Sequence, residues 1–153
     1  MTNFKFRLQP LMKLREAERD RCREELAEAY QAEQILADRQ EAIRKQIEDA
    51  KQLARHRSQP GSIAVDGLLD THRYELGLAT QLQHLLVQRE TVREEIERRR
   101  EAAVAANREL RILEKLRKRG ELEFRRKQQR LEVLQQDEIA LRRHGAAREG
   151  DRS

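Results

Sequence analysis

The stretch RHRSQPGSIAVDG, residues 55–67, contains the one clear interruption in a chain whose other residues almost all favour helix. Proline lacks a backbone hydrogen-bond donor and glycine tolerates a positive φ, so the pair Pro60 and Gly61 should end a helix. Asp66 then stands where an N-cap residue would begin the next helix. These residues predict a loop over 58–66 between two helices.

Before this loop, apolar residues recur at alternating spacings of three and four. Pro10 suits the first position of a helix, which predicts a helix over residues 10–57. Ten of the fourteen positions in the repeat are apolar, and a repeat averaging 3.5 residues predicts left-handed supercoiling. The positions are Leu8, Met12, Arg15, Arg19, Cys22, Leu26, Ala29, Glu33, Leu36, Gln40, Ile43, Ile47, Ala50 and Ala54.

After the loop, the same spacing predicts a second helix over residues 67–144, followed by a frayed tail at 145–153. Twelve of its eighteen repeat positions are apolar. They are Leu82, Leu85, Arg89, Val92, Ile96, Arg99, Ala103, Ala106, Leu110, Leu113, Arg117, Gly120, Phe124, Lys127, Leu131, Leu134, Glu138 and Leu141. We call these two stripes of heptad positions the seams of the helices.

Two such helices joined by a short loop should fold back on each other. The predicted fold class is therefore all-α, a long antiparallel two-helix coiled coil (αα-hairpin) with unequal arms, forming a single domain over residues 1–153. At 1.5 Å per residue the arms would measure about 70 Å and about 115 Å. If the chain folds back at residue 62, residue i lies opposite approximately residue 124 − i. Residues after about 117 then extend beyond the first arm, and the seam there lacks a partner.

Polar residues interrupt both seams. A polar seam residue costs stability but can fix the register of a coiled coil. Arg117, Gly120 and Lys127 fall where the second helix extends beyond the first, so the seam there should lack a partner and would either fray or pack on another protein. Gly120 is unfavourable inside a helix by about 1 kcal/mol relative to alanine. The polar seam residues in question are Glu33, Gln40, Arg89, Arg99, Arg117 and Lys127.

Charge dominates the composition. Of the 153 residues, 40% are charged, 37% are hydrophobic and 3% are aromatic, which excludes a compact globule with a large core. Residues 108–130 hold ten Lys or Arg against four Glu, in a chain of net charge +5. This basic segment could neutralise phosphates, but Phe124 is its only aromatic ring, so nucleic acid is an unlikely partner. An acidic protein surface fits the charge equally well.

The sequence offers no set of residues for catalysis. It contains no phosphate-binding glycine loop and no nucleophile elbow, and its four histidines form no metal-ligand pattern. Cys22 falls in a seam, where a buried thiol is expected, and a lone cysteine permits no intrachain disulfide. We therefore predict no catalytic residues, no metal and no cofactor. With no membrane span and no signal peptide evident, we expect a cytosolic protein.

The N-terminus combines apolar and basic residues. Phe4, Phe6 and Leu8 alternate before the helix begins, and Lys13 and Arg15 follow. Two interpretations stay open. The rings could dock on a partner protein, or they could fold back as a hydrophobic staple on the first turns or on the second helix near residues 113–120.

Two stretches of the chain are similar to the FliJ family of flagellar export proteins. The opening FKFRLQPLMKLRE, residues 4–16, resembles the start of that family, and ELAEAYQAE continues the resemblance. Residues 113–143, LEKLRKRGELEFRRKQQRLEVLQQDEIALRR, resemble the closing pattern, including Asp137, Glu138 and Arg143. Gly120 departs from that pattern, because a helix former is expected there.

The resemblance implies a specific function. Members of the family are antiparallel coiled coils that resemble the stalk of rotary ATPases and insert into the hexameric flagellar export ATPase. They also contact the cytoplasmic domain of the export gate membrane protein and help to transfer export chaperones, which implies a location in the cytoplasm at the inner face of the membrane. The matching stalk of an injectisome-type secretion system, the stalk of a conventional rotary ATPase and an unrelated basic coiled-coil module are the alternatives.

The resemblance also suggests which residues meet these partners. Tyr74 and Leu78, together with His72 and Leu82, would form an exposed strip after the loop and would contact the export gate. The residues expected to contact the ATPase ring are Phe4, Phe6, Leu8, Lys13, Arg15, Arg117, Lys118 and Arg119.

Overall fold

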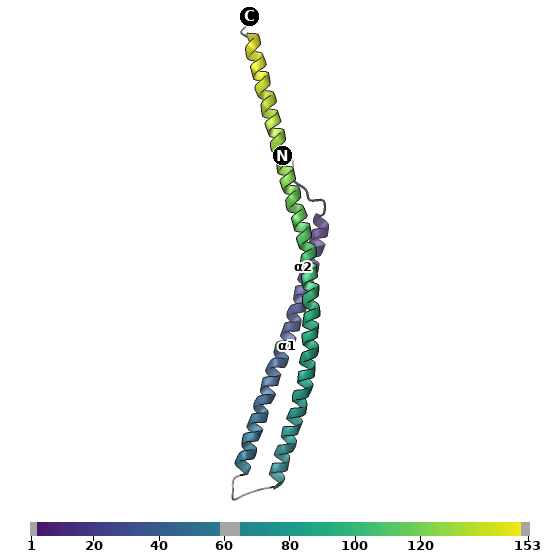
Figure 1. Cartoon of the computed structure of the whole chain (residues 1–153), viewed down its shortest axis with the longest axis vertical. Coiled ribbons are helices and arrows are strands. Elements are labelled where there is room, and N and C mark those ends of the chain that lie inside the picture. Colours follow the sequence, from purple (N-terminus) through teal and green to yellow (C-terminus); the bar gives the residue numbers. More distant parts are fainter. Residues whose placement is uncertain (1–2, 59–64, 151–153) are drawn as a thin grey trace. The chain divides into compact units, whose positions relative to one another are not determined.

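A computed structural model describes residues 3–58 and 65–150 of the chain, with side chains as far as residue 145. Helix α1 spans Gln9–Arg57 and helix α2 spans Val65–Gly150 (Figure 1). The described residues contain no strand. The predicted all-α fold with two antiparallel helices is confirmed, and the arms are unequal at 49 and 86 residues.

The helix boundaries differ slightly from those predicted. Helix α1 begins at Gln9, one residue before Pro10. Helix α2 begins at Val65, so Asp66 lies in the first turn rather than at the N-cap, where its negative charge still favours the positive end of the helix dipole. Helix α2 also continues to Gly150, beyond the predicted end at residue 144. The sequence there, GAARE, contains alanine, arginine and glutamate, which favour helix.

Parts of two predictions fall outside the described residues. These are the central part of the predicted loop, residues 59–64, which includes Pro60 and Gly61, and the last part of the predicted tail, residues 151–153. On the α1 side of the loop, Ser58 directly follows the helix, and its Oγ and backbone N both donate hydrogen bonds to the carbonyl of Ala54, at 2.8 and 3.1 Å. Basic residues in the last turn, including Arg57, complement the negative end of the helix dipole.

By packing, the chain divides into two compact units, each described by itself. The hairpin unit comprises Glu18–Ala106, and the terminal unit comprises Met1–Ala17 together with Asn107–Ser153. In each unit a part of α1 lies antiparallel beside a part of α2 (Figure 1).

The hairpin unit is held by its seam. Ile43, Leu78 and Leu85 form a buried cluster, against which further apolar seam residues pack. Those residues are Leu36, Ile47 and Leu82. The seam of α2 thus starts earlier than the predicted Leu82, since Leu78 and Thr71 are also buried. The prediction that Leu78 lies on an exposed strip is therefore wrong, because only 4% of its surface is accessible.

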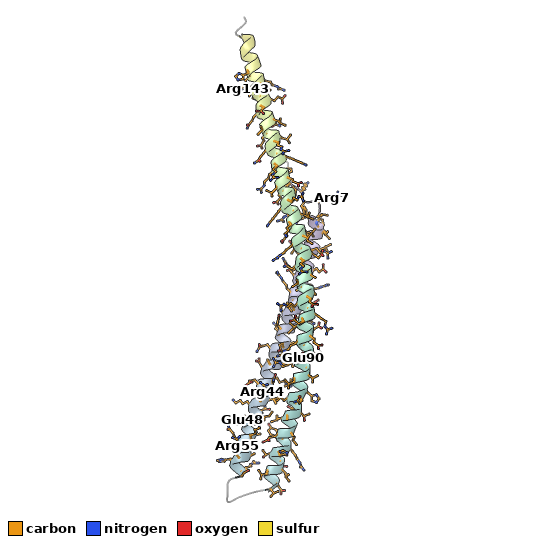
Figure 2. The ribbon with its side chains drawn as sticks, viewed as in Figure 1. Arg7, Arg44, Glu48, Arg55, Glu90 and Arg143 are labelled. Atoms are coloured by element: carbon orange, nitrogen blue, oxygen red, sulfur yellow. The ribbon has the colours of Figure 1, made fainter. Side chains whose placement is uncertain are left out.

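Charged side chains cover the outside of the helices. Figure 2 labels four charged residues of the hairpin unit: Arg44, Glu48, Arg55 and Glu90. All four are exposed. Neighbouring charges on one helix pair at spacings of three or four, as between Arg98 and Glu95 at 3.5 Å. Such exposed pairs add little stability, and their main effect is solubility.

Candidate functional site

In the terminal unit, a short non-helical segment, residues 3–8, precedes α1. Its end is tied to the helix by backbone hydrogen bonds: Gln9 N donates to the carbonyl of Phe6 at 3.1 Å, and Met12 N donates to the carbonyl of Leu8 at 2.9 Å. The first bond satisfies one of the amide groups that a helix start leaves without a partner, and the second is the first i→i−4 bond of the helix. The segment is therefore fixed in direction where it leaves α1.

Phe6 packs onto the core of the terminal unit. This core consists of Met12, Leu110 and Leu113, and Leu110 is 1% exposed, the most buried of the large side chains in the described residues. Phe6 itself is only partly buried. Because its ring packs against the cluster, Phe6 contributes to folding as well as to the surface.

Phe4 reaches further along α2 and lies over Gly120. A Cβ atom added at Gly120 would sit 3.0 Å from Cζ and 3.2 Å from Cε2 of the Phe4 ring, which is closer than ordinary contact. The ring also meets Phe124, with centroids 5.9 Å apart and planes tilted by 50°, a favourable arrangement for an aromatic pair. Gly120, which departs from the expected helix former, thus provides the space that Phe4 occupies.

Of the two interpretations left open for the N-terminal rings, the structure shows the second one in the chain alone. Phe4 and Phe6 fold back on α2. Sequence reasoning missed Phe124 as the partner of Phe4, although the predicted register supplied a signal. In the predicted register, the numbers of two facing residues add up to about 124. Phe4 therefore lies opposite Gly120, one turn from Phe124.

The basic residues near this segment differ in exposure. Lys13 is exposed, and Leu8 keeps 38% of its surface accessible. Arg15 is partly buried, and its Nη2 lies 3.9 Å from Oε2 of Glu109 on α2, in the same register. Leu8 and Lys13 can therefore meet a partner without any change in the fold.

The three basic residues of α2 that were predicted to contact the ATPase ring also differ in exposure. Lys118 and Arg119 are exposed, and Arg119 Nε lies 3.2 Å from Glu123 Oε1 one turn away. Arg117 is partly buried in the seam, with its Nε 3.9 Å from Glu121 Oε1. That Nε atom is shielded from solvent and has no hydrogen-bond partner, so Arg117 belongs to the packed face rather than to the outer surface.

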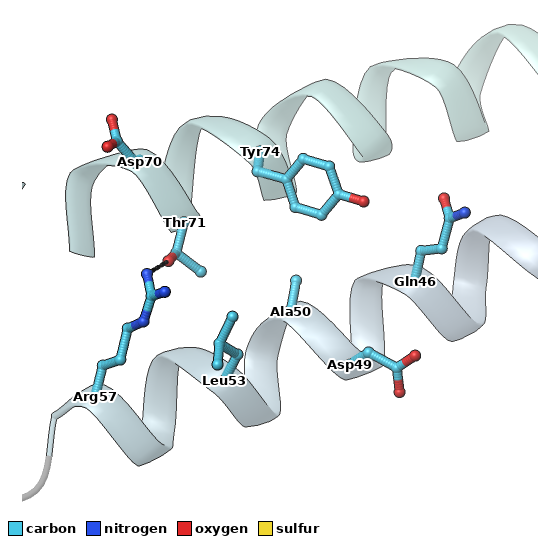
Figure 3. Close-up of a pocket in the computed structure, with 8 residues that line it drawn as sticks. All are labelled: Gln46, Asp49, Ala50, Leu53, Arg57, Asp70, Thr71 and Tyr74. Atoms are coloured by element: carbon cyan, nitrogen blue, oxygen red, sulfur yellow. Dashed lines mark hydrogen bonds between the residues drawn. The ribbon is translucent and has the colours of Figure 1, made fainter. Parts of the chain in front are cut away.

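A second feature lies in the hairpin unit near the loop. A groove of about 490 Å³ lies between α1 and α2. Figure 3 shows its lining residues, with Tyr74 beside the apolar residues Ala50 and Leu53. Tyr74 keeps 54% of its surface exposed, and Leu53 keeps 48%. The other lining residues are Gln46, Asp49, Arg57, Asp70 and Thr71.

The loop end of this groove is closed by hydrogen bonds. Arg57 Nη1 donates to the carbonyl of Gly67 at 3.3 Å and to Oγ1 of Thr71 at 3.4 Å. The hydroxyl of Thr71 donates in turn to the same carbonyl at 2.8 Å. These bonds hold the ends of α1 and α2 together, so the groove combines a fixed frame with an exposed aromatic ring.

Further along the hairpin unit, Arg89 crosses the seam. Its Nη2 lies 2.6 Å from Oε1 of Glu33, and its Nη1 donates to Oε1 of Gln40. Arg93 adds a contact of 3.3 Å to the same carboxylate. The hydrogen bond from Arg89 is the main reason why the pKa of Glu33 lies below its usual value. These bonds connect α1 to α2 in one register, which is the effect that polar seam residues can have in a coiled coil.

Several features are absent from the described part of the chain. Residues 3–58 and 65–150 contain no group of three or more His, Cys, Asp or Glu side chains placed to hold a metal ion. In the same residues, no helix is apolar over a length sufficient to cross a membrane.

A family comparison identifies the chain. Residues 4–149 match the family described as Flagellar FliJ protein. The chain belongs to the FliJ family. The match covers both the N-terminal segment and nearly all of α2, including Gly120. As a FliJ family member the chain is a component related to flagellar protein export and associates with the flagellar export apparatus. No curated protein and no solved structure matches it.

Proposed function

We propose that this FliJ family member is a non-enzymatic stalk and coupling subunit of the flagellar type III export ATPase complex. It would bind the hexameric export ATPase through the terminal unit and the cytoplasmic domain of the export gate through the hairpin unit. It would also escort export chaperones, in the cytoplasm at the inner face of the membrane at the flagellar base. Family membership and the two helical units support this proposal.

The packed N-terminal segment is the observation that carries the ATPase contact. Phe4 lies against Gly120 and Phe124, and Phe6 lies against the Met12 cluster. A segment held at both rings presents one defined surface, which lowers the entropic cost of binding. We therefore propose that the rings position this surface rather than forming all of it.

The outer face of this surface is apolar and basic. Leu8 is 38% exposed, and Lys13, Lys118 and Arg119 are exposed. Such a surface fits a ring lumen lined by apolar and acidic groups, because complementary charge favours encounter and correct orientation. Arg15 and Arg117 are partly buried and would act by holding the two helices in place.

For the export gate, the Tyr74 groove is the proposed contact. Tyrosine supplies a large apolar area and a hydroxyl at low entropic cost, and such residues are enriched where proteins bind each other. Leu53 and Ala50 extend the apolar floor beneath the ring. Leu78 is buried and contributes by packing the groove wall against Ile43 rather than by touching the gate.

The ATPase contact is tested by measuring ATP hydrolysis by the purified cognate export ATPase with and without this chain. We expect the chain to stimulate hydrolysis and the double variant Phe4→Ala, Phe6→Ala to lose most of this effect. Lys13→Glu should also weaken it, because this change reverses an exposed charge without touching the core. Tyr74→Ala is the matched control and should stimulate normally. Full stimulation by both test variants would remove the terminal unit from the mechanism.

The gate contact is tested by affinity measurement with the isolated cytoplasmic domain of the gate protein. Tyr74→Ala should weaken binding about tenfold, as expected for an interface tyrosine worth more than 1 kcal/mol. Phe4→Ala is the control and should bind as the unchanged chain does. If Tyr74→Ala binds normally, the groove is not the gate contact.

A further inference from the structure

The seam of α2 continues beyond the part that is covered. Up to Phe124 the seam residues are buried or partly buried. The next five seam positions are all exposed, with Leu131 at 52%, Leu134 at 62% and Leu141 at 70%. We call these five residues the distal strip; they are Lys127, Leu131, Leu134, Glu138 and Leu141.

Three leucines at heptad spacing on one exposed helix face require a partner. In water an exposed stripe of this kind is unfavourable, while burial of each leucine contributes to association. The stripe is in phase with the covered seam of the same helix, so a second helix could pack on it by the same knobs-into-holes geometry. The order of charges along the strip indicates which helix would pack on it.

The distal strip is complementary to itself when reversed. In an antiparallel coiled coil, first and fourth heptad positions of the two chains face each other. If Leu131 faces Leu134 of a second copy, the same register places Lys127 opposite Glu138 of that copy. By symmetry each contact occurs twice, which gives two leucine layers enclosed by two opposite-charge layers.

Charges beside the strip follow the same register. Arg130 and Asp137 directly precede the seam positions 131 and 138, which places both on one flank of the strip. Antiparallel pairing brings Arg130 of one copy beside Asp137 of the other, again twice. Parallel pairing in register would instead place Lys127 beside Lys127 and Glu138 beside Glu138. Like charges facing each other disfavour that arrangement, so the sequence selects the antiparallel one.

We propose that the distal strip is a self-association surface, through which two copies of this chain form an antiparallel dimer about a twofold axis between residues 132 and 133. The dimer closes after two copies, since the surface is the same on both. In this register Leu141 faces Phe124 of the other copy at the edge of the surface, where Phe4 of that copy packs on one side of the ring. This inference concerns the chain alone and does not depend on the proposed ATPase contact.

The surface is short, so the dimer is expected to be weak. Residues 127–141 span about 21 Å of helix, which buries less than a standard interface. We expect a Kd on the order of 10–100 µM, measured by sedimentation equilibrium of the full chain over a range that extends about tenfold above and below it. The unchanged chain should shift from monomer to dimer within this range.

Charge reversal gives the decisive test. Lys127→Glu and Glu138→Lys should each raise the Kd about tenfold or more, because each replaces two attractions per dimer by two repulsions. The double variant Lys127→Glu, Glu138→Lys should restore dimerisation. An equimolar mixture of the two single variants should also dimerise, because in the mixed dimer each contact between positions 127 and 138 again joins opposite charges. Arg125→Glu and Glu132→Lys carry the same charge changes outside the strip and serve as controls.

The outcomes separate the alternatives. Loss in each single variant with recovery in the double variant supports the antiparallel dimer. A chain that stays monomeric throughout overturns the proposal and leaves the strip for a different protein. A dimer that none of the charge changes affects also overturns it, because that dimer would form elsewhere. Circular dichroism of each variant confirms that the helices themselves are intact.

Discussion

Two consecutive parts of α2 carry the same heptad pattern but differ in what covers them. From Leu110 to Phe124 the seam meets α1 and the N-terminal segment, and Leu110 is almost completely buried. From Lys127 to Leu141 the seam is exposed. The spacing is therefore the same, and the difference arises only from where the first arm ends. A heptad predicts the face that a helix will bury, but it does not state which chain will cover it.

The largest expected contrast comes from shortening one leucine in each part. Leu110→Ala should lower the free energy of unfolding by about 3 kcal/mol, because it opens a cavity in a buried cluster. Leu134→Ala should change it by less than about 0.5 kcal/mol in the dilute chain, because its side chain is 62% exposed. Urea unfolding followed by circular dichroism measures both. Equal losses would mean that the distal seam is covered in the monomer.

The two N-terminal rings hold residues 3–8 against α2. Phe4→Ala should raise the equilibrium constant for detachment of residues 3–8 from α2 by about tenfold, because it removes a half-buried ring and an aromatic pair. The readout is the rate of trypsin cleavage after Lys5 and Arg7, which requires the segment to detach. Lys115→Ala is a suitable control on an exposed position of α2 and should leave the rate unchanged. If Phe4→Ala is cleaved no faster, Phe4 does not hold the segment.

The hairpin unit provides a third region, whose seam is connected by charge. The pKa of Glu33 is lowered in the folded chain, mainly by its hydrogen bond from Arg89. The ionised carboxylate therefore stabilises the fold fully above the unfolded pKa, near 4.5, and this contribution is lost as the pH falls through the folded pKa.

Glu33→Gln should make unfolding less dependent on pH below about 4.5. At pH 7 it should cost about 1 kcal/mol, because a hydrogen bond to a charged partner is weakened. Thermal unfolding between pH 3 and pH 7 measures both effects. Glu48→Gln, at an exposed position of α1, is the control. Identical pH profiles for Glu33→Gln and the unchanged chain would remove the Arg89 bond from the stability of the hairpin unit.

The smallest net effect on stability is expected at Gly120. Alanine there should favour helix by about 1 kcal/mol, but its Cβ would press on the Phe4 ring at 3.0 Å. The unfolding free energy should rise slightly or stay constant while trypsin cleavage after Lys5 and Arg7 becomes faster. Opposite changes in the two measurements distinguish a packing role from a purely helical one. A rise in stability with unchanged cleavage would show that Phe4 does not require the glycine.

Much of this contrast was predictable from the sequence. The heptad identified the buried face of both helices, and the position of the loop gave the register that brings Arg15 beside Glu109. The start of the α2 seam was harder, because Thr71 and Glu75 are polar and interrupt the apolar repeat before Leu78. Leu78 was therefore expected at the surface, although pairing with α1 buries it.

The candidate site was predictable only in part. Composition and spacing marked Phe4 and Phe6 as unusual but did not state what they touch. From the sequence, Gly120 was expected only to destabilise α2, because helix propensity describes a residue within its own helix and ignores what packs against it. The role of Gly120 becomes evident only in the structure, where the Phe4 ring packs against the backbone at this position. The two ends of that contact are separated by most of the chain, and no local pattern connects them.

Amide hydrogen exchange along α2 tests the central comparison most directly. The chain should be diluted below the concentration at which it self-associates. We expect strong protection for residues 110–123 and rapid exchange for residues 127–145, because an uncovered helix end opens without breaking any packing. Protection of residues 127–145 should then rise as the concentration increases. Equal protection of both segments in the dilute chain would mean that the distal seam is already covered in the monomer, and the contrast between the two parts of α2 would be wrong.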